Sequence, residues 1–323
     1  EQALPGAVLT RVAASHIRVG TFQYFAARGE IDRVKQLADY VIARHYPAAR
    51  DEANPYRTLL DGVIGRQARL IARWMLVGFI HGVMNTDNMS ILGITLDYGP
   101  FGFIDDYDPG FICNHSDYNG RYAFHQQPYI GLWNLSCLAQ ALLPLASKEA
   151  LKAALDSYAP ICERRYMELM QAKVGLIEEH EEDAALIQDL LGLMQQSRAD
   201  YTNCFRALGA FSSAEGSLNE PLRDCFLDRA AFDAWAGRYA ARLRGEQSRD
   251  EERRIRMNRV NPKYVLRNYL AQTAIEKAQQ KDYSEVDRLL ALLQDPYSDQ
   301  PGMDAYAAAP PNWGKHLSVS CSS

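Results

Sequence analysis

The sequence lacks several features that would place the protein in an obvious class. None of its six cysteines forms a close Cys-x-x-Cys pair, which argues against a zinc site and is typical of reduced cytosolic thiols. The longest uncharged apolar stretch, near residues 74–84, is far shorter than the roughly 20 residues that a membrane span needs. No signal peptide, internal repeat or low-complexity segment is visible. We therefore expect a soluble cytoplasmic protein of bacterial type, with no membrane partner.

Positive charge is also scarce. The 323 residues include 35 Lys and Arg against 40 Asp and Glu, for a formal net charge of −5 and a pI near 5.9. Proteins that bind nucleic acids generally need a basic face, so no nucleic-acid partner is expected. The hydrophobic content of 47% is ample for the core of one large domain or two.

The hydrophobic pattern indicates an α+β fold that is predominantly helical. A partly β-branched stretch predicts a strand over 5–13, and Ser15 is expected to cap the helix that follows. We expect a catalytic region over residues 1–147 and a helical C-terminal region over 148–323. Helical periodicity predicts further helices over 30–46, 58–79, 127–145, 148–158, 161–176, 182–196, 199–209, 228–243, 263–279 and 284–293.

Three further stretches have structural interpretations. Trp133 is expected in the core. The acidic run over 178–183 is expected to be the solvated start of a helix, where negative charge is favourable. The alternating charges over 250–259 are expected to form a salt-bridged surface.

One segment, residues 81–103, combines His, Asn and Asp with glycines and apolar runs: HGVMNTDNMSILGITLDYGPFGF. Residues 89–96 have the pattern of a short hairpin with Gly93 at its turn. Because a hairpin brings its two ends together, Asn88 and Asp97 can share one cation. Their hard oxygen ligands suit Mg²⁺ or Mn²⁺ rather than zinc.

The spacing in this segment matches the catalytic loop of protein kinases. Asn88 falls where the metal-binding Asn of a kinase stands, and Asp97 of Asp-Tyr-Gly falls where the Asp of Asp-Phe-Gly stands. Two residues after His81, however, a kinase has its proton-accepting Asp and this chain has Val83, which cannot accept a proton. The nearest carboxylate is Asp87, and we predict that it is the catalytic base.

These motifs resemble the selenoprotein O family, also called the YdiU family. Its members have a protein-kinase-like fold, lack the usual catalytic Asp, and transfer AMP from ATP to protein hydroxyls. The resemblance extends over the whole chain and rests on residues 81–103 together with Asn114-His115-Ser116-Asp117, Gln127-Pro128, Leu132-Trp133-Asn134-Leu135 and the closing Ser320-Cys321-Ser322-Ser323.

The resemblance implies roles for several residues. It places nucleotide-binding arginines at Arg11 and Arg18, whose guanidinium groups suit phosphate, and gives Asp97 a part in binding both nucleotide and metal. It implies ATP bound end for end relative to a kinase, with AMP passing to Ser, Thr or Tyr of protein substrates. The glycine-rich phosphate loop and the lysine of a kinase N-terminal lobe cannot be placed before residue 81. We therefore expect that this lobe is missing from the sequence and that these 323 residues alone are inactive or nearly so.

Two alternatives remain open at the level of sequence. An atypical kinase could use Asp87 as its base, and a pseudokinase scaffold could work without catalysis. A further hypothesis is a redox link between Cys113 and Cys321, the latter at a position that is selenocysteine in some members of the resembled family.

Overall fold

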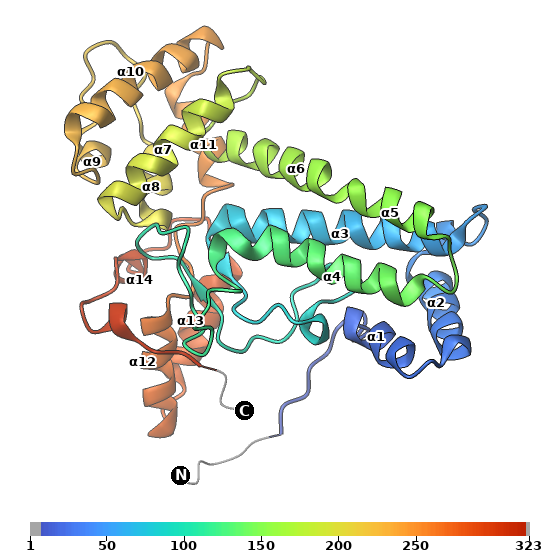
Figure 1. Ribbon diagram of the computed structural model, residues 1–323. Helices are drawn as coiled ribbons and strands as arrows, with labels where there is room; N and C mark the ends of the chain where they lie inside the picture. The colour runs from blue at the N-terminus through green and yellow to red at the C-terminus, as the bar shows by residue number, and fades with distance from the viewer. Residues whose placement is uncertain (1–7, 321–323) are drawn as a thin grey trace.

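The computed structural model describes residues 8–320 and is mostly helical, with one two-stranded sheet (Figure 1). The predicted α+β, predominantly helical class is therefore confirmed. The helices are α1 Val19–Ala27, α2 Ile31–His45, α3 Pro55–Val77, α4 Gln127–Leu142, α5 Lys148–Asp156, α6 Tyr158–Lys173, α7 Asp183–Ser197, α8 Tyr201–Leu208, α9 Glu220–Arg223, α10 Arg229–Gly245, α11 Asp250–Asn258, α12 Asn268–Gln279, α13 Ser284–Gln294 and α14 Asp304–Ala307. Short 3-10 turns lie at η1 Pro47–Ala49, η2 Thr86–Asn88, η3 Phe124–Gln126 and η4 Gly314–His316.

Helix α3 runs through the middle of the molecule. It begins where the Asn54 side chain accepts a hydrogen bond from the Arg57 amide (3.1 Å), with Pro55 in the first turn. It ends at Gly78, which adopts the left-handed conformation (φ 72°) that favours glycine. Figure 1 shows α4, α5 and α6 lying along it, and all three contact it. Because α3 is surrounded by these helices, it fixes the start of the polar segment at residue 81 close to the core.

The two-stranded sheet holds the two ends of that polar segment together. Strand β1 (Phe79–Ile80) pairs antiparallel with β2 (Gly102–Phe103), with Phe79 opposite Phe103 and Ile80 opposite Gly102. Residues 81–101 thus form a closed loop whose base is fixed to the end of α3.

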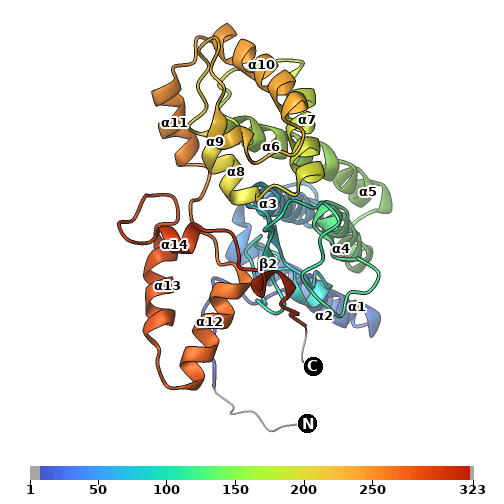
Figure 2. The ribbon, with the colours of Figure 1, turned by 90° about the vertical axis from the view of Figure 1, so that its left-hand side faces the viewer.

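Two large hydrophobic cores share α3. Trp74 belongs to the core formed with α1, α2, α4 and α5, whereas Leu76 belongs to the core formed with α6, α7, α8 and α10. A third, small cluster joins α12 to α13, which Figure 2 shows as an antiparallel pair beside the main body. Arg267, at the start of α12, ties this pair to the rest by ion pairs with Asp105 and Asp200.

Three expectations about the N-terminal part and the core were wrong. Residues 8–13 form no strand, because Val8, Leu9 and Val12 are exposed and no other described segment pairs with them. Helix α1 begins only at Val19, and the Ser15 hydroxyl instead accepts a hydrogen bond from the Ile17 amide. Trp133 is 37% exposed.

In the C-terminal part, α11 was not predicted as a helix, although its exposed Arg254–Glu251 pair agrees with the expected salt-bridged surface. Helix α12 begins later than 263, because the amides of Lys263 and Tyr264 both donate to the Pro296 carbonyl and hold that segment out of the helix.

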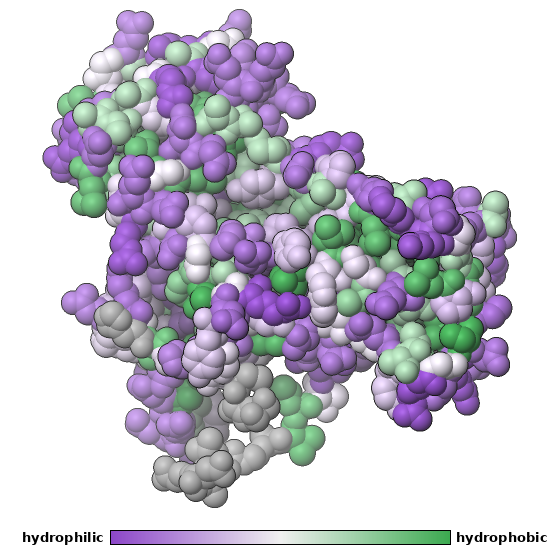
Figure 3. All heavy atoms as spheres, in the orientation of Figure 1, coloured by the Kyte–Doolittle hydropathy of each residue, from purple (hydrophilic) through white to green (hydrophobic). Residues whose placement is uncertain are grey.

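Among the described residues, no helix is long and apolar enough to cross a membrane. The face in Figure 3 is largely hydrophilic, with small hydrophobic patches gathered toward the α1 and α4 end.

A lysine without a carboxylate partner lies at the junction of α6, α8 and the segment after α11. Lys173 is buried, donates a hydrogen bond to Asn261 Oδ1 (3.0 Å), and lies over the rings of Tyr201 and Phe205. Burial lowers the pKa of Lys173 to about 7. Folding therefore favours the neutral amine over much of the alkaline range.

Replacing this lysine should change how stability depends on pH. Relative to Lys173→Met, the wild type should gain unfolding free energy between about pH 7 and about pH 10, because over that window the unfolded lysine still binds a proton that the folded one has released. Below about pH 7 both states are protonated and the difference should be flat. Urea unfolding of both proteins at several pH values measures this, with the exposed Lys152→Met as control; a difference independent of pH would contradict it.

Candidate functional site

The N-terminal segment pairs with the hairpin of the polar loop. Residues 17–19 lie antiparallel to residues 89–91, with the Val19 amide donating to the Met89 carbonyl (3.0 Å) and the Ile91 amide to the Ile17 carbonyl (3.3 Å). The hairpin itself closes through an antiparallel bridge between Met89 and Thr95, as predicted, with Gly93 (φ 64°) at its turn. This pairing carries Arg18 to the end of the hairpin.

At that end, two arginines converge on one carboxylate. Arg11 Nη1 lies 2.9 Å from Asp97 Oδ1, and Arg18 Nη2 lies 2.9 Å from Asp97 Oδ2 and 3.3 Å from Oδ1. The three side chains are 28–35% exposed, so solvent reaches the cluster. Asp97 itself has a positive φ of 60°, an unusual conformation that Asp tolerates better than most residues. The structure thus brings together three residues that the sequence places 86 and 79 positions apart.

His81 positions the backbone just before Asp97. Its ring is buried against Trp74 (5.3 Å between ring centroids), and Nε2 lies 2.8 Å from the Leu96 carbonyl oxygen. Burial lowers the pKa of His81, so the ring is neutral at pH 7 and Nε2–H donates to that carbonyl. In the sequence His81 serves only as a marker of spacing, and no local pattern indicates this positioning role.

Buried amide side chains satisfy the rest of the loop backbone. Gln127, at the start of α4, accepts from the His81 amide (3.1 Å) and donates to the Phe79 carbonyl (2.9 Å). Asn134 donates to the Met84 carbonyl (2.9 Å), and Gln67 of α3 donates to the Ser90 carbonyl. These three side chains are at most 1% exposed. The loop has little secondary structure of its own, so these groups replace the partners that a helix or sheet would supply.

The side chain of Asn88 is oriented by the backbone of Val83. Its Nδ2 donates to the Val83 carbonyl (2.9 Å), which leaves Oδ1 as the atom that can meet a ligand. Val83 therefore contributes through its backbone, although its side chain can neither accept nor donate a proton.

Asp87 lies against the first turn of α1. A side chain at position 20 would clash with Asp87 Oδ1, so Gly20 makes room for this carboxylate. The side chain is exposed and has no hydrogen-bond or ion-pair partner among residues 8–320. The carboxylate lies near the N-terminus of α1, where the helix dipole favours negative charge.

The donor set at the loop fits a hard divalent cation in type. Asn88 Oδ1 and the Asp97 carboxylate are oxygen ligands of the kind that Mg²⁺ and Mn²⁺ take, usually with several waters and phosphate oxygens completing the shell. Within the described part of the chain, no group of three or more His, Cys, Asp or Glu side chains is arranged as a metal site. Asn88 and Asp97 alone would thus supply only part of a cation's ligands, with water or phosphate oxygens as the rest.

Cys113 lies beneath the same loop. Its Sγ is 2.9 Å from the Pro100 carbonyl oxygen, and burial raises the pKa of its thiol to about 12. The neighbouring His115 amide donates to the Val319 carbonyl (2.8 Å). Cys321, the other half of the predicted redox link, lies outside the described residues, so that link stays a prediction.

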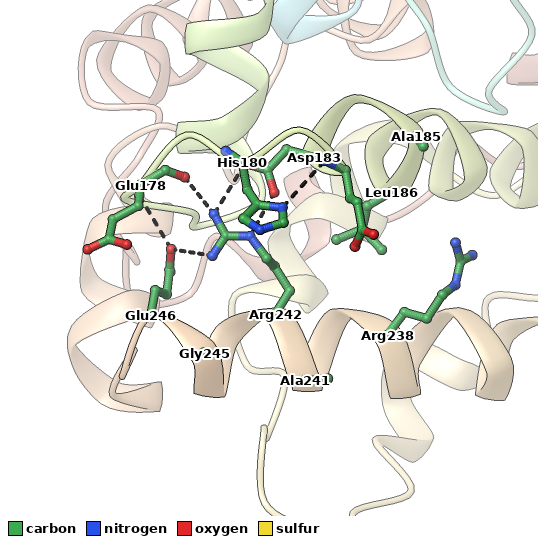
Figure 4. A pocket seen from close by; sticks show the side chains of 11 residues that line it. Glu178, His180, Asp183, Ala185, Leu186, Arg238, Ala241, Arg242, Gly245 and Glu246 are labelled. Carbon is green, nitrogen blue, oxygen red and sulfur yellow. Dashed lines mark hydrogen bonds and ion pairs between the residues drawn. The ribbon is translucent and has the colours of Figure 1, made fainter.

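A separate cavity of about 680 Å³ lies between the start of α7 and α10 (Figure 4). There Arg242 forms ion pairs with Asp183 (2.8 Å) and Glu246 (3.0 Å) and donates to the Glu178 carbonyl. The acidic run over 178–182 is exposed, as expected for a solvated helix start, but Asp183 is buried against Arg242. The contacts of this cluster are those of a structural salt bridge.

The chain belongs to the family described as "Protein adenylyltransferase SelO", whose model matches residues 2–294. It is similar to proteins named "Protein nucleotidyltransferase YdiU". The relative from Myxococcus xanthus is 56% identical over 98% of this chain and 65% of its own length. The relative from Thioalkalivibrio sulfidiphilus is 56% identical over 100% of this chain and 66% of its own length, and that from Klebsiella pneumoniae (strain 342) is 53% identical over the same shares. The chain thus spans slightly less than two thirds of these relatives.

The buried amides of the loop lead to a stability prediction. Gln127→Leu should lower the free energy of unfolding by about 2–5 kcal/mol, because it leaves the His81 amide and the Phe79 carbonyl buried without partners. Urea unfolding measures the change. Gln140→Leu, at an exposed position on the same helix, is the matched control and should change the value by less than about 0.5 kcal/mol. Equal effects of the two variants would contradict the role assigned to Gln127.

Proposed function

We propose that this chain carries the catalytic region of a metal-dependent protein adenylyltransferase that transfers AMP from ATP to Ser, Thr or Tyr hydroxyls. One observation supports the proposal: Arg11 and Arg18, the expected phosphate-binding residues, converge on Asp97, one of the two expected metal ligands, at a partly exposed point. Membership in the adenylyltransferase family supports it.

We further infer that residues 55–103 correspond to the core of a protein-kinase C-lobe. The order of elements along the chain supports this inference: a long buried helix is followed by a loop with Asn88, a short hairpin and then Asp97. The residues after 147 would extend this lobe as a helical region.

The ion-pair cluster suggests how the site accepts its substrate. The two guanidinium groups form ion pairs with the single carboxylate of Asp97, which leaves the cluster with a net positive charge. When a nucleotide binds, Arg11 and Arg18 would turn to its phosphate oxygens, which are bidentate acceptors of the same kind as a carboxylate. Asp97 and Asn88 would then hold a divalent cation, which supplies electrostatic stabilisation of the triphosphate charge.

Asp87 would act as the base. It would take the proton of the acceptor hydroxyl as that oxygen forms its bond to the α-phosphorus of ATP. The bond from the α-phosphorus to its bridging oxygen toward the β-phosphorus would break, and pyrophosphate would leave. The absence of any other partner for the Asp87 carboxylate in the described chain supports this role.

Two other functions fit some of the same residues. An atypical kinase would use the same cation and base but transfer the terminal phosphate. A pseudokinase scaffold would need no proton acceptor, in agreement with Val83, but it would also have no need of the cluster at Asp97.

Intact-protein mass spectrometry separates the three functions. The chain is tested both alone and within a protein of its relatives' length, after incubation with ATP, Mg²⁺ or Mn²⁺ and a bacterial lysate as a source of protein substrates. An AMP-sized increment is expected on the longer protein or on lysate proteins, and little or none with the 323-residue chain alone. Asp97→Ala should abolish it, and Asp87→Asn should slow it by about 10²–10⁴-fold, the usual contribution of a general base.

Asp51→Asn, which removes an exposed carboxylate elsewhere, is the matched control and should leave the rate unchanged. A phosphate-sized increment would establish the kinase instead. No increment on any protein would favour the scaffold, and robust turnover by the 323-residue chain would contradict the expected need for a further lobe.

A further inference from the structure

An open groove of about 640 Å³ lies at the C-terminal end of α3, and its lining does not include Arg11, Arg18 or Asp97. Its walls come from α3, α6, the hairpin of the polar loop, and the segments after α11 and α13. In Figure 1 this is the region where the end of α3 meets α6 beneath α11. We call it the α3–α6 groove.

The charge of the groove is opposite to that of the whole protein. Three arginines, Arg73, Arg165 and Arg259, line it, and no Asp or Glu does. Arg73 and Arg259 are exposed and have no side-chain hydrogen-bond or ion-pair partner in residues 8–320. Arg165 pairs through Nη1 with Glu168 outside the groove (2.8 Å), while its buried Nε has no partner. In a chain with a net charge of −5, such a site selects a ligand with negative charge.

The floor of the groove is apolar. Trp74, Leu169 and Val260 lie between the arginines, and Tyr98, 56% exposed, stands at one rim. The polar atoms nearest the floor, Trp74 Nε1 and Thr95 Oγ1, are bonded to each other at 3.0 Å. Between the arginines the groove therefore offers mainly apolar surface, which matches an aliphatic or aromatic side chain.

The floor is also connected to the candidate active site. Trp74 packs on His81, and His81 holds the Leu96 carbonyl just before Asp97. Tyr98 follows Asp97 directly. A ligand in the groove would thus contact Tyr98, next to Asp97 in the chain, and Trp74, which packs on His81.

We propose that the α3–α6 groove binds an acidic peptide segment of a partner protein, with carboxylates on the three arginines and an aliphatic or aromatic side chain on the floor. The proposal does not depend on the transfer reaction, because it concerns binding alone.

Fluorescence polarisation of a synthetic peptide tests the proposal. The probe is a fluorescein-labelled peptide in which pairs of Glu alternate with Leu, titrated with the 323-residue chain. Reversing two groove charges together, Arg73→Glu with Arg259→Glu, should weaken binding by about tenfold or more. The matched control reverses two exposed arginines elsewhere, Arg33→Glu with Arg249→Glu, and should change the affinity by less than about twofold. Circular dichroism verifies that both double variants are folded.

Two altered peptides test the two halves of the recognition. A peptide with Gln in place of Glu should bind the wild type weakly, with an affinity that no longer differs between the wild type and the groove variant. A peptide with Ser in place of Leu should bind the wild type more weakly than the original peptide does. The proposal is overturned if the first peptide does not bind, if both double variants lose affinity equally, or if the Gln peptide binds as well as the Glu peptide. Displacement of the peptide by ATP in metal-free buffer, or self-association that the groove variant abolishes, would assign the groove to a nucleotide or to a second copy of the chain instead.

Discussion

The polar loop depends on one constraint, which is that its buried backbone groups must find hydrogen-bond partners without a helix or an extended sheet to provide them. Gln67, Gln127 and Asn134 supply those partners from α3 and α4. A buried amide or carbonyl left unpaired costs about 1–3 kcal/mol, so several at once would be incompatible with a marginally stable fold. The two helices therefore support the loop as well as the core.

The ion-pair cluster at Asp97 plays a different part. Its side chains are about one third exposed, and ion pairs at such positions add little to stability because water screens them. Its value lies in placement, since it keeps two guanidinium groups and a carboxylate together until a competing anion or cation arrives. The backbone hydrogen bonds between residues 17–19 and 89–91 hold the N-terminal segment in place here.

Two polar regions of the molecule thus share one buried connection. Trp74 forms the floor of the α3–α6 groove and also packs on His81, whose neutral ring holds the hairpin end. This connection is made of packed rings and one hydrogen bond, and it joins the arginines of an exposed groove to the carboxylate of the candidate active site.

Several features were determined by the sequence itself. The helical class, most helix positions, the hairpin around Gly93 and the spacing of Asn88 and Asp97 follow from local periodicity and turn chemistry. Tertiary structure decided the rest. Residues 8–13 have strand composition but find no partner in the described chain. The pairing of Ile17 and Arg18 with residues 90–91 holds these two residues extended, so that α1 begins only at Val19. Arg11 and Arg18 lie 86 and 79 positions from Asp97 in the sequence, and the buried Gln127 bonds to backbone groups far from it in the chain. Such contacts leave no local pattern in the sequence because they depend on which elements meet in space.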